Sequence, residues 1–244
     1  MKLYYNEQII DASQKELIKF SKWMNRHHGN YPVIVGGWAV YAHLTKVSGF
    51  VPLGSRDIDV VFPSRHLMDH ILLTYFRYHG FKREKKFLEA SYIKEVKTPL
   101  GLEQIFIDAC TLQDVREISE LKIKIPWRLV GQYNELFEIS PKTFIYVPAI
   151  ELLLAQKIGA CIERIIQRKT APSNYLESKI WKDCYDVVNL TARRPVNKIQ
   201  LKIFLKQAKL NKHLEILYKE LQAQKEVLAE AKTGVNKLKQ KIGF

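Results

Sequence analysis

The stretch VIVGGWAVYAHL, residues 33–44, and the stretch DIDVVF, residues 57–62, decide the fold of this chain. The first begins as a short β-branched run, which predicts a buried strand, and continues through Gly36 and Gly37 into a predicted helix over residues 38–46. The second stretch predicts another strand with two acids at its start. Because successive side chains of a strand alternate between its faces, Asp57 and Asp59 point to one face and Ile58 to the other.

The same patterns predict the elements on either side of these two stretches. Helices are expected over residues 11–28, 66–80, 148–167, 177–191 and most of 198–240, and a β-hairpin is expected over 90–96 and 103–109. Residues 112–143 are not assigned, although LKIKI and FEI within them resemble strands. Since strands end near residue 146, we predict an α+β fold. A mixed β-sheet domain flanked by helices would occupy residues 1–146, and a helical, basic domain would occupy residues 147–244.

Composition excludes several classes of protein. A chain with 47% hydrophobic and 26% charged residues is not mostly disordered. Its 3 cysteines lack C-x-x-C spacing, which argues against a disulfide scaffold and favours a reducing compartment. No apolar run approaches the about 20 residues that a membrane-spanning helix needs, and the N-terminus lacks the apolar region of a signal peptide. We therefore expect a cytoplasmic protein with no membrane partner.

The positive charge is concentrated in the second part of the chain. The net charge is +14; residues 1–145 hold 20 Lys and Arg against 16 Asp and Glu, and residues 146–244 hold 19 against 9. A basic domain attracts polyanions such as nucleotides or RNA. A well-solvated basic helical surface would have the same composition, so both interpretations stay open.

The acids of the predicted strands suggest a metal site. Asp57 and Asp59 share one face of a strand, about 7 Å apart, and their repulsion is costly unless a cation lies between them. Asp108 is the single acid of another apolar strand, IFIDAC, residues 105–110. If the two strands are neighbours, three carboxylates converge. Such oxygen ligands suit Mg²⁺ and fit two-metal phosphoryl or nucleotidyl transfer, while Gly36 and Gly37 would let backbone N–H groups approach a phosphate.

This ordered set of motifs resembles the nucleotidyltransferase superfamily that includes DNA polymerase beta, the CCA-adding enzymes and the kanamycin nucleotidyltransferases. The long separation between Gly37 and Asp57, with a loop ending in Ser55 and Arg56, is closest in pattern to the AbiEii-like toxin nucleotidyltransferases. That branch also has a helix with a lysine and then a K/R-D-x-x-D helix. In this chain the stretch LLLAQKIGACIER, which contains Lys157, resembles the first of these helices. The stretch IWKDCYDVVNL, which contains Lys182, Asp183 and Asp186, resembles the second. The resemblance covers roughly residues 30–190.

The resemblance implies a catalytic domain over residues 1–146 and an activity. The enzyme would move a nucleoside monophosphate from a nucleoside triphosphate such as ATP to an acceptor hydroxyl, on tRNA or a protein, and release pyrophosphate. A toxin of this kind would have an antitoxin partner. The implied catalytic residues, which would also hold two Mg²⁺ ions, are Asp57, Asp59 and Asp108. The implied nucleotide-binding residues are Gly36, Gly37, Ser55, Arg56, Lys157 and Asp183.

Several features leave alternatives open. The family often has Ser or Thr after the two glycines, whereas this chain has Trp38, which either packs in the core or stacks on a base. Asp183 and Asp186 lie three residues apart on one helical face, and a structural ion-pair network with Lys182 or Arg56 is the other explanation for them. The alternative function is a non-catalytic nucleic-acid-binding module with a nucleotidyltransferase-like fold.

Overall fold

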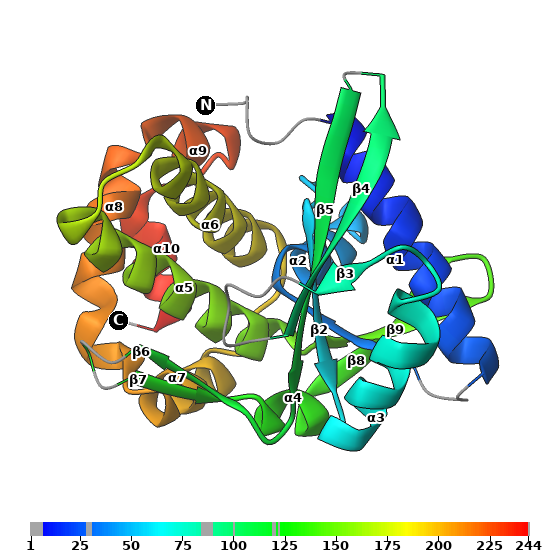
Figure 1. Ribbon diagram of the computed structural model, residues 1–244. Coiled ribbons are helices and arrows are strands. Elements are labelled where there is room, and N and C mark those ends of the chain that lie inside the picture. Colours follow the sequence, from blue (N-terminus) through cyan, green and yellow to red (C-terminus); the bar gives the residue numbers. More distant parts are fainter. Residues whose placement is uncertain are drawn as a thin grey trace.

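A computed structural model describes residues 7–27, 31–83, 90–99, 101–118, 121 and 123–243 of the chain. Figure 1 shows a β-sheet in the middle of the molecule and a group of helices beside it. The strands are β1 (Val33–Val35), β2 (Asp57–Phe62), β3 (Lys82–Arg83), β4 (Ala90–Thr98), β5 (Gly101–Thr111), β6 (Val115–Ile118), β7 (Ile123–Pro126), β8 (Asn134–Ser140) and β9 (Thr143–Pro148). The α-helices are α1 (Glu7–His27), α2 (Gly36–Thr45), α3 (Arg65–Ile71), α4 (Arg128–Gln132), α5 (Ile150–Thr170), α6 (Asn174–Arg193), α7 (Lys198–Gln207), α8 (Leu214–Ala223), α9 (Lys225–Glu230) and α10 (Val235–Ile242).

The described strands form one mixed sheet and one separate hairpin. The 7-stranded sheet has the order β3-β4-β5-β2-β1-β9-β8, and β6 pairs with β7 alone. Two pairs, β2 with β5 and β1 with β9, are parallel, while the other neighbours in the large sheet are antiparallel. The predicted combination of a mixed sheet and helices is confirmed.

The two faces of β2 have different roles. Ile58, Val60 and Phe62 are buried, and the Phe62 ring lies 6.5 Å from the ring of Phe20 on α1. Because side chains alternate along a strand, Asp57 and Asp59 face away from α1. Figure 1 shows α1 and α3 on one side of the sheet and α5, α6 and the later helices on the other. The two acids therefore face the helical part of the molecule.

Helices α5 and α6 pack side by side and form the other wall of the region that the acids face. Helix α6 begins where the hydroxyl of Ser173 accepts a hydrogen bond from the backbone N–H of Leu176, at 3.2 Å, as an N-cap does. Buried Cys161 and Cys184 meet between the helices with their sulfur atoms 3.7 Å apart, and both are free thiols. This packing holds two consecutive helices against each other beside the acids.

Several predicted boundaries are wrong. Helix α1 begins at Glu7 rather than residue 11, so Ser13 lies inside the helix, where its hydroxyl accepts a hydrogen bond from the indole of Trp38. Helix α2 starts at Gly36, so the diglycine lies in the first turn of the helix. The helix expected over residues 66–80 changes at Leu72 into a short π-helical turn. The unassigned region contains β6, β7, α4 and β8, and LKIKI and FEI contribute to β7 and β8.

The buried apolar side chains form a core that includes residues from both the sheet and the C-terminal helices. Beyond β9, the described residues form helices and the segments that connect them. The division of the chain after residue 146 stays a prediction. Within the described residues, no helix has the length and apolar character that crossing a membrane requires.

Candidate active site

The three predicted acids lie on two neighbouring strands. Asp59 on β2 is the register partner of Asp108 on β5, and Asp57 lies two residues earlier on β2. Register partners on parallel strands point to the same face of a sheet. The structure therefore brings Asp57, Asp59 and Asp108 to one face, as the sequence predicts if the strands are neighbours.

The environment of these acids disfavours their charged forms. Burial, together with the negative charges of Asp108 and Asp57, raises the pKa of Asp59 to about 7. Burial likewise raises the pKa of Asp108, although the hydroxyl of Ser91 donates a hydrogen bond of 2.5 Å to its Oδ1 and opposes the rise. Carboxylates held together in this way favour a cation beside them.

The diglycine lies directly against the acids. Gly36 has a φ of +64°, and a Cβ atom at this position would lie 1.9 Å from Oδ2 of Asp59. A Cβ on Gly37 would lie 2.7 Å from the Oγ of Ser55. At position 36, only glycine can adopt the positive φ and also approach the carboxylate of Asp59 this closely. The start of α2, with its free backbone N–H groups, is therefore in contact with the acids and with Ser55.

Replacing Gly36 by alanine is expected to lower the free energy of unfolding by more than the backbone strain alone would. The new Cβ must displace the Asp59 carboxylate, so we expect a loss of about 2–4 kcal/mol in the free energy of unfolding. Gly80 is a matched control, because it also has a positive φ, +78°, but a Cβ added there would meet nothing within 4 Å. Gly80→Ala should cost only about 1 kcal/mol. Urea unfolding measures both; equal losses would contradict the contact with Asp59.

A cleft of about 510 Å³ separates the acids from α5 and α6. Its walls come from the sheet, from the start of α2, from the β6–β7 hairpin and from the two helices. The predicted residues that line it are Gly36, Gly37, Ser55, Asp57, Asp59, Asp108, Lys157 and Asp183. The cleft is large enough for a ligand of nucleotide size, since small-molecule sites typically measure about 300–1,000 Å³.

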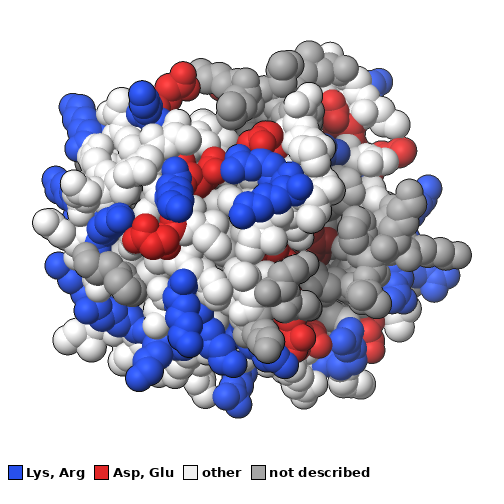
Figure 2. Space-filling view, turned by 90° about the vertical axis from the view of Figure 1, so that its left-hand side faces the viewer, with Lys and Arg blue, Asp and Glu red and all other residues white. Residues whose placement is uncertain are grey.

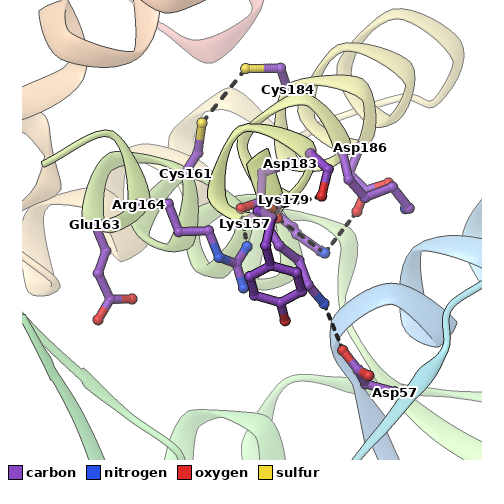
Figure 3. Close-up of polar contacts among 12 residues, drawn as sticks. Asp57, Lys157, Cys161, Glu163, Arg164, Lys179, Asp183, Cys184 and Asp186 are labelled. Atoms are coloured by element: carbon purple, nitrogen blue, oxygen red, sulfur yellow. Dashed lines mark hydrogen bonds and ion pairs between the residues drawn. The ribbon is translucent and has the colours of Figure 1, made fainter. Parts of the chain in front are cut away.

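Lys157 and Asp183 belong to an ion-pair network between α5 and α6 (Figure 3). The Nζ of Lys157 lies 2.7 Å from Oδ2 of Asp186 and 3.6 Å from Oδ1 of Asp183. Arg164 also pairs with Asp183, and Lys182 pairs with Asp186. Three cations thus share two carboxylates. Asp186 and Lys182 form the ion pair that the structural interpretation predicts, while Asp183 pairs with Lys157 and Arg164 rather than with Lys182 or Arg56.

Burial and charge act in opposite directions in this network. Burial lowers the pKa of Lys157, but Asp186 and Asp183 outweigh it and raise that pKa above its ordinary value. Burial raises the pKa of Asp183, but Arg164 and Lys157 outweigh it and hold that pKa below its ordinary value. Lys157 and Asp183 are therefore both charged at neutral pH. Burial lowers the pKa of Lys182 below its ordinary value, although Asp186 opposes the change. Lys157 and Arg164 are therefore the cations that face the two carboxylates at this wall of the cleft.

Lys179 connects α6 to the acids across the cleft. Its Nζ donates a hydrogen bond of 2.7 Å to Oδ2 of Asp57 (Figure 3). Burial raises the pKa of Asp59 and of Asp108, and the charge of Lys179 opposes both rises. An ammonium group therefore already provides part of the positive charge that the acids favour.

Two residues discussed from the sequence lie elsewhere. Arg56 does not line the cleft; its Nε donates to the backbone carbonyl of Gln104 at 2.7 Å, and its guanidinium lies 4.9 Å from the ring centre of Phe106. Trp38 is buried, and its indole N–H donates to the hydroxyl of Ser13 at 3.2 Å. Packing in the core, rather than stacking on a base, is the role that the structure assigns to Trp38.

The sequence interpretation missed three residues of this site. Helical spacing could have indicated Lys179 and Arg164. Lys179 lies four residues before Asp183, and Arg164 lies seven residues after Lys157, so each shares a helix face with a predicted site residue. Ser91 carries no such signal, since it reaches Asp108 only through the pairing of β4 with β5. The signal that could have found it is the predicted hairpin itself, because strands over 90–96 and 103–109 place residue 91 opposite residue 108.

No model of a known protein family matches this chain, and no curated protein matches it. Within the ranges that the structure describes, no group of three or more His, Cys, Asp or Glu side chains is already arranged to hold a metal ion.

Proposed function

We propose that this protein is a metal-dependent nucleotidyltransferase, which moves a nucleoside monophosphate from a nucleoside triphosphate to an acceptor hydroxyl and releases pyrophosphate. The observation that carries the proposal is the pairing of Asp59 with Asp108 on neighbouring parallel strands, with Asp57 on the same face. The contact between Gly36 and Asp59 supports it, because it places backbone N–H groups beside the acids. In this proposal residues 1–146 form the catalytic domain and residues 147–244 the helical domain.

The residues of the site fit Mg²⁺. The donors are carboxylate oxygens, which are the ligands that this ion prefers. The ammonium of Lys179 already lies 2.7 Å from a carboxylate oxygen of Asp57, where a metal ion would bind. Asp57 and Asp59 would hold two ions, and Asp108 would complete the second site. Bound there, the ions supply neutralisation of the β- and γ-phosphates and polarisation of the α-phosphate.

The other residues would bind the nucleotide and move a proton. Backbone N–H groups at Gly36 and Gly37 would donate to phosphate oxygens, with the hydroxyl of Ser55 beside them. The ammonium of Lys157 and the guanidinium of Arg164 would attract the triphosphate from the opposite wall. Asp108 would take the proton from the acceptor hydroxyl. At the same time the hydroxyl oxygen would bond to the α-phosphorus, and the bond from the α-phosphorus to pyrophosphate would break. The resemblance also implies nucleotide binding by Asp183 and Arg56. Asp183 would instead hold Lys157 and Arg164 in place, and Arg56 lies outside the cleft.

The acceptor is proposed to be a polyanion such as RNA. The C-terminal helices expose many lysines, namely Lys198, Lys202, Lys206, Lys209, Lys212, Lys219, Lys225, Lys232 and Lys237. Figure 2, which looks onto this side of the molecule, shows Lys and Arg spread over it with some Asp and Glu between them. A broad positive face attracts a phosphate backbone without requiring a sequence. A protein hydroxyl, and an antitoxin partner as in the AbiEii-like proteins, are the other expectations that follow from the resemblance.

Pyrophosphate release tests the proposal against the non-catalytic alternative. We expect the full-length protein with Mg²⁺, a nucleoside triphosphate and total RNA to release pyrophosphate and to label the RNA when the α-phosphate is radioactive. Asp57→Ala should abolish both signals while RNA binding persists, because the lysines of the C-terminal helices are unchanged. If the wild type and Asp57→Ala bind RNA equally and neither consumes any of the four nucleotides, the binding module is the correct function.

A further inference from the structure

Lys179 is placed differently from the other cations of the cleft. Lys157, Lys182 and Arg164 pair with carboxylates of α6, and Arg116 pairs with Glu163 of α5. Lys179 instead reaches from α6 to the sheet and pairs with Asp57. Both side chains of this pair remain partly open to solvent, at 20% and 23% exposure. The pair is therefore accessible to a competing ion.

The contact with Lys179 occupies part of the acid site. Asp57, Asp59 and Asp108 share one face, yet among the described residues they do not form a ready metal-binding group. One oxygen of Asp57 is already bound by the Nζ of Lys179. An ammonium group and a divalent cation cannot both occupy the same side of that oxygen, so the two must compete for it.

We propose that Lys179 is an exchangeable counter-ion of the acid site: it neutralises Asp57 in the free protein and moves to a phosphate of the nucleotide when a divalent cation takes its place. This inference rests on the proposed function and adds a positioning residue to it. A lysine suits the exchange, because its ammonium is a compact charge on a flexible stem with three donors. In this proposal the exchange requires a rotation of the Lys179 side chain, and helix α6 stays in place.

The exchange couples the binding of metal and nucleotide. A divalent cation that arrives alone must displace Lys179, and this cost weakens its binding. A nucleotide that arrives with the cation gives the displaced ammonium a phosphate to pair with, which recovers the cost. By linkage, each ligand then raises the affinity for the other. Removal of the Lys179 charge should reduce this coupling.

Binding of Mn²⁺, followed by electron paramagnetic resonance on the full-length protein, tests the inference without any turnover. We expect Lys179→Met to bind Mn²⁺ about tenfold more tightly than the wild type. A neighbouring charge typically changes a pKa by about one unit, and the same interaction free energy changes an affinity about tenfold. The same variant should bind a nucleoside triphosphate less tightly in the presence of Mn²⁺, by about tenfold. Lys179→Arg, which keeps the charge, should bind Mn²⁺ as weakly as the wild type.

Arg116→Met is the matched control, because it removes a cation of the same cleft whose partner is Glu163 rather than an acid of the trio. It should leave Mn²⁺ affinity unchanged, and circular dichroism checks that each variant is folded. Equal Mn²⁺ affinity in wild type and Lys179→Met, with loss of binding in Asp57→Asn, would overturn the counter-ion role and leave the metal site standing. If none of these proteins binds Mn²⁺, the proposed function fails together with the inference.

Discussion

Asp59→Asn is expected to lower pyrophosphate release by about 10³-fold while the protein stays folded. Asparagine has the shape of aspartate but lacks the charge that a divalent cation needs, and its neighbours Asp57 and Asp108 remain in place. The variant is compared with the wild type in the Mg²⁺-dependent assay. Asp69→Asn, which changes an exposed acid outside the cleft, should leave turnover unchanged. A folded Asp59→Asn variant with wild-type turnover would exclude Asp59 from the proposed metal site.

The same variant should change how stability depends on pH in metal-free buffer. The pKa of Asp59 is raised from 3.8 to about 7 in the folded protein, so the folded state keeps a proton that the unfolded state loses. This group therefore lowers wild-type stability progressively as the pH rises from about 4 to about 7. Asparagine does not ionise, and Asp59→Asn should exceed the wild type in melting temperature at pH 8 but not near pH 4. A lower melting temperature for the variant at pH 8 would contradict the repulsion among the acids.

Asp186→Ala is expected to reduce the free energy of unfolding by about 3–5 kcal/mol, the usual cost of breaking a buried ion pair from one side. Asp186 is fully buried and pairs with both Lys157 and Lys182. Its removal leaves Lys182 as a buried charge without this partner, and Lys157 keeps only its longer contact with Asp183. Urea unfolding, followed by circular dichroism, measures the loss.

A compensating variant separates the lost charge pair from the lost volume. Asp186→Leu combined with Lys182→Met replaces the pair by apolar side chains and should recover much of the stability lost in Asp186→Leu alone. Asp11→Ala breaks an exposed pair with Lys15 on α1 and should have a far smaller effect. If the double variant is no more stable than Asp186→Leu, an uncompensated charge on Lys182 is not the cause of the loss.

Local pattern predicted the elements that carry the site, because each is a short run with one strong signal. The β-branched run before Gly36 and the apolar run around Asp108 are strands, and the apolar stripe around Lys157 is a helix. The boundaries failed where contacts between distant residues decide them. The helix expected from residue 11 begins at Glu7, and Ser13 lies within it, where its hydroxyl accepts a hydrogen bond from the buried indole of Trp38.

The acids could be predicted from the sequence, whereas their partners could not. Asp57 and Asp59 share a face by strand alternation alone, and Asp108 stands out as the single acid of an apolar strand. The contacts of Lys179 with Asp57 and of Ser91 with Asp108 join residues 122 and 17 positions apart in the chain. The first contact depends on the packing of α6 against the cleft, which no short window of sequence contains. The second depends on a serine that the predicted hairpin places opposite Asp108, but no side-chain pattern marks its hydrogen bond.

The close approach of Gly36 to Asp59 has an evolutionary consequence. The carboxylate fills the volume that any larger residue at position 36 would need, so position 36 cannot change while the aspartate stays where it is. In relatives that retain aspartate at the position of Asp59, we expect glycine at the position of Gly36. In relatives that have lost the acid, selection against larger residues at the glycine is relaxed, and the two positions should covary.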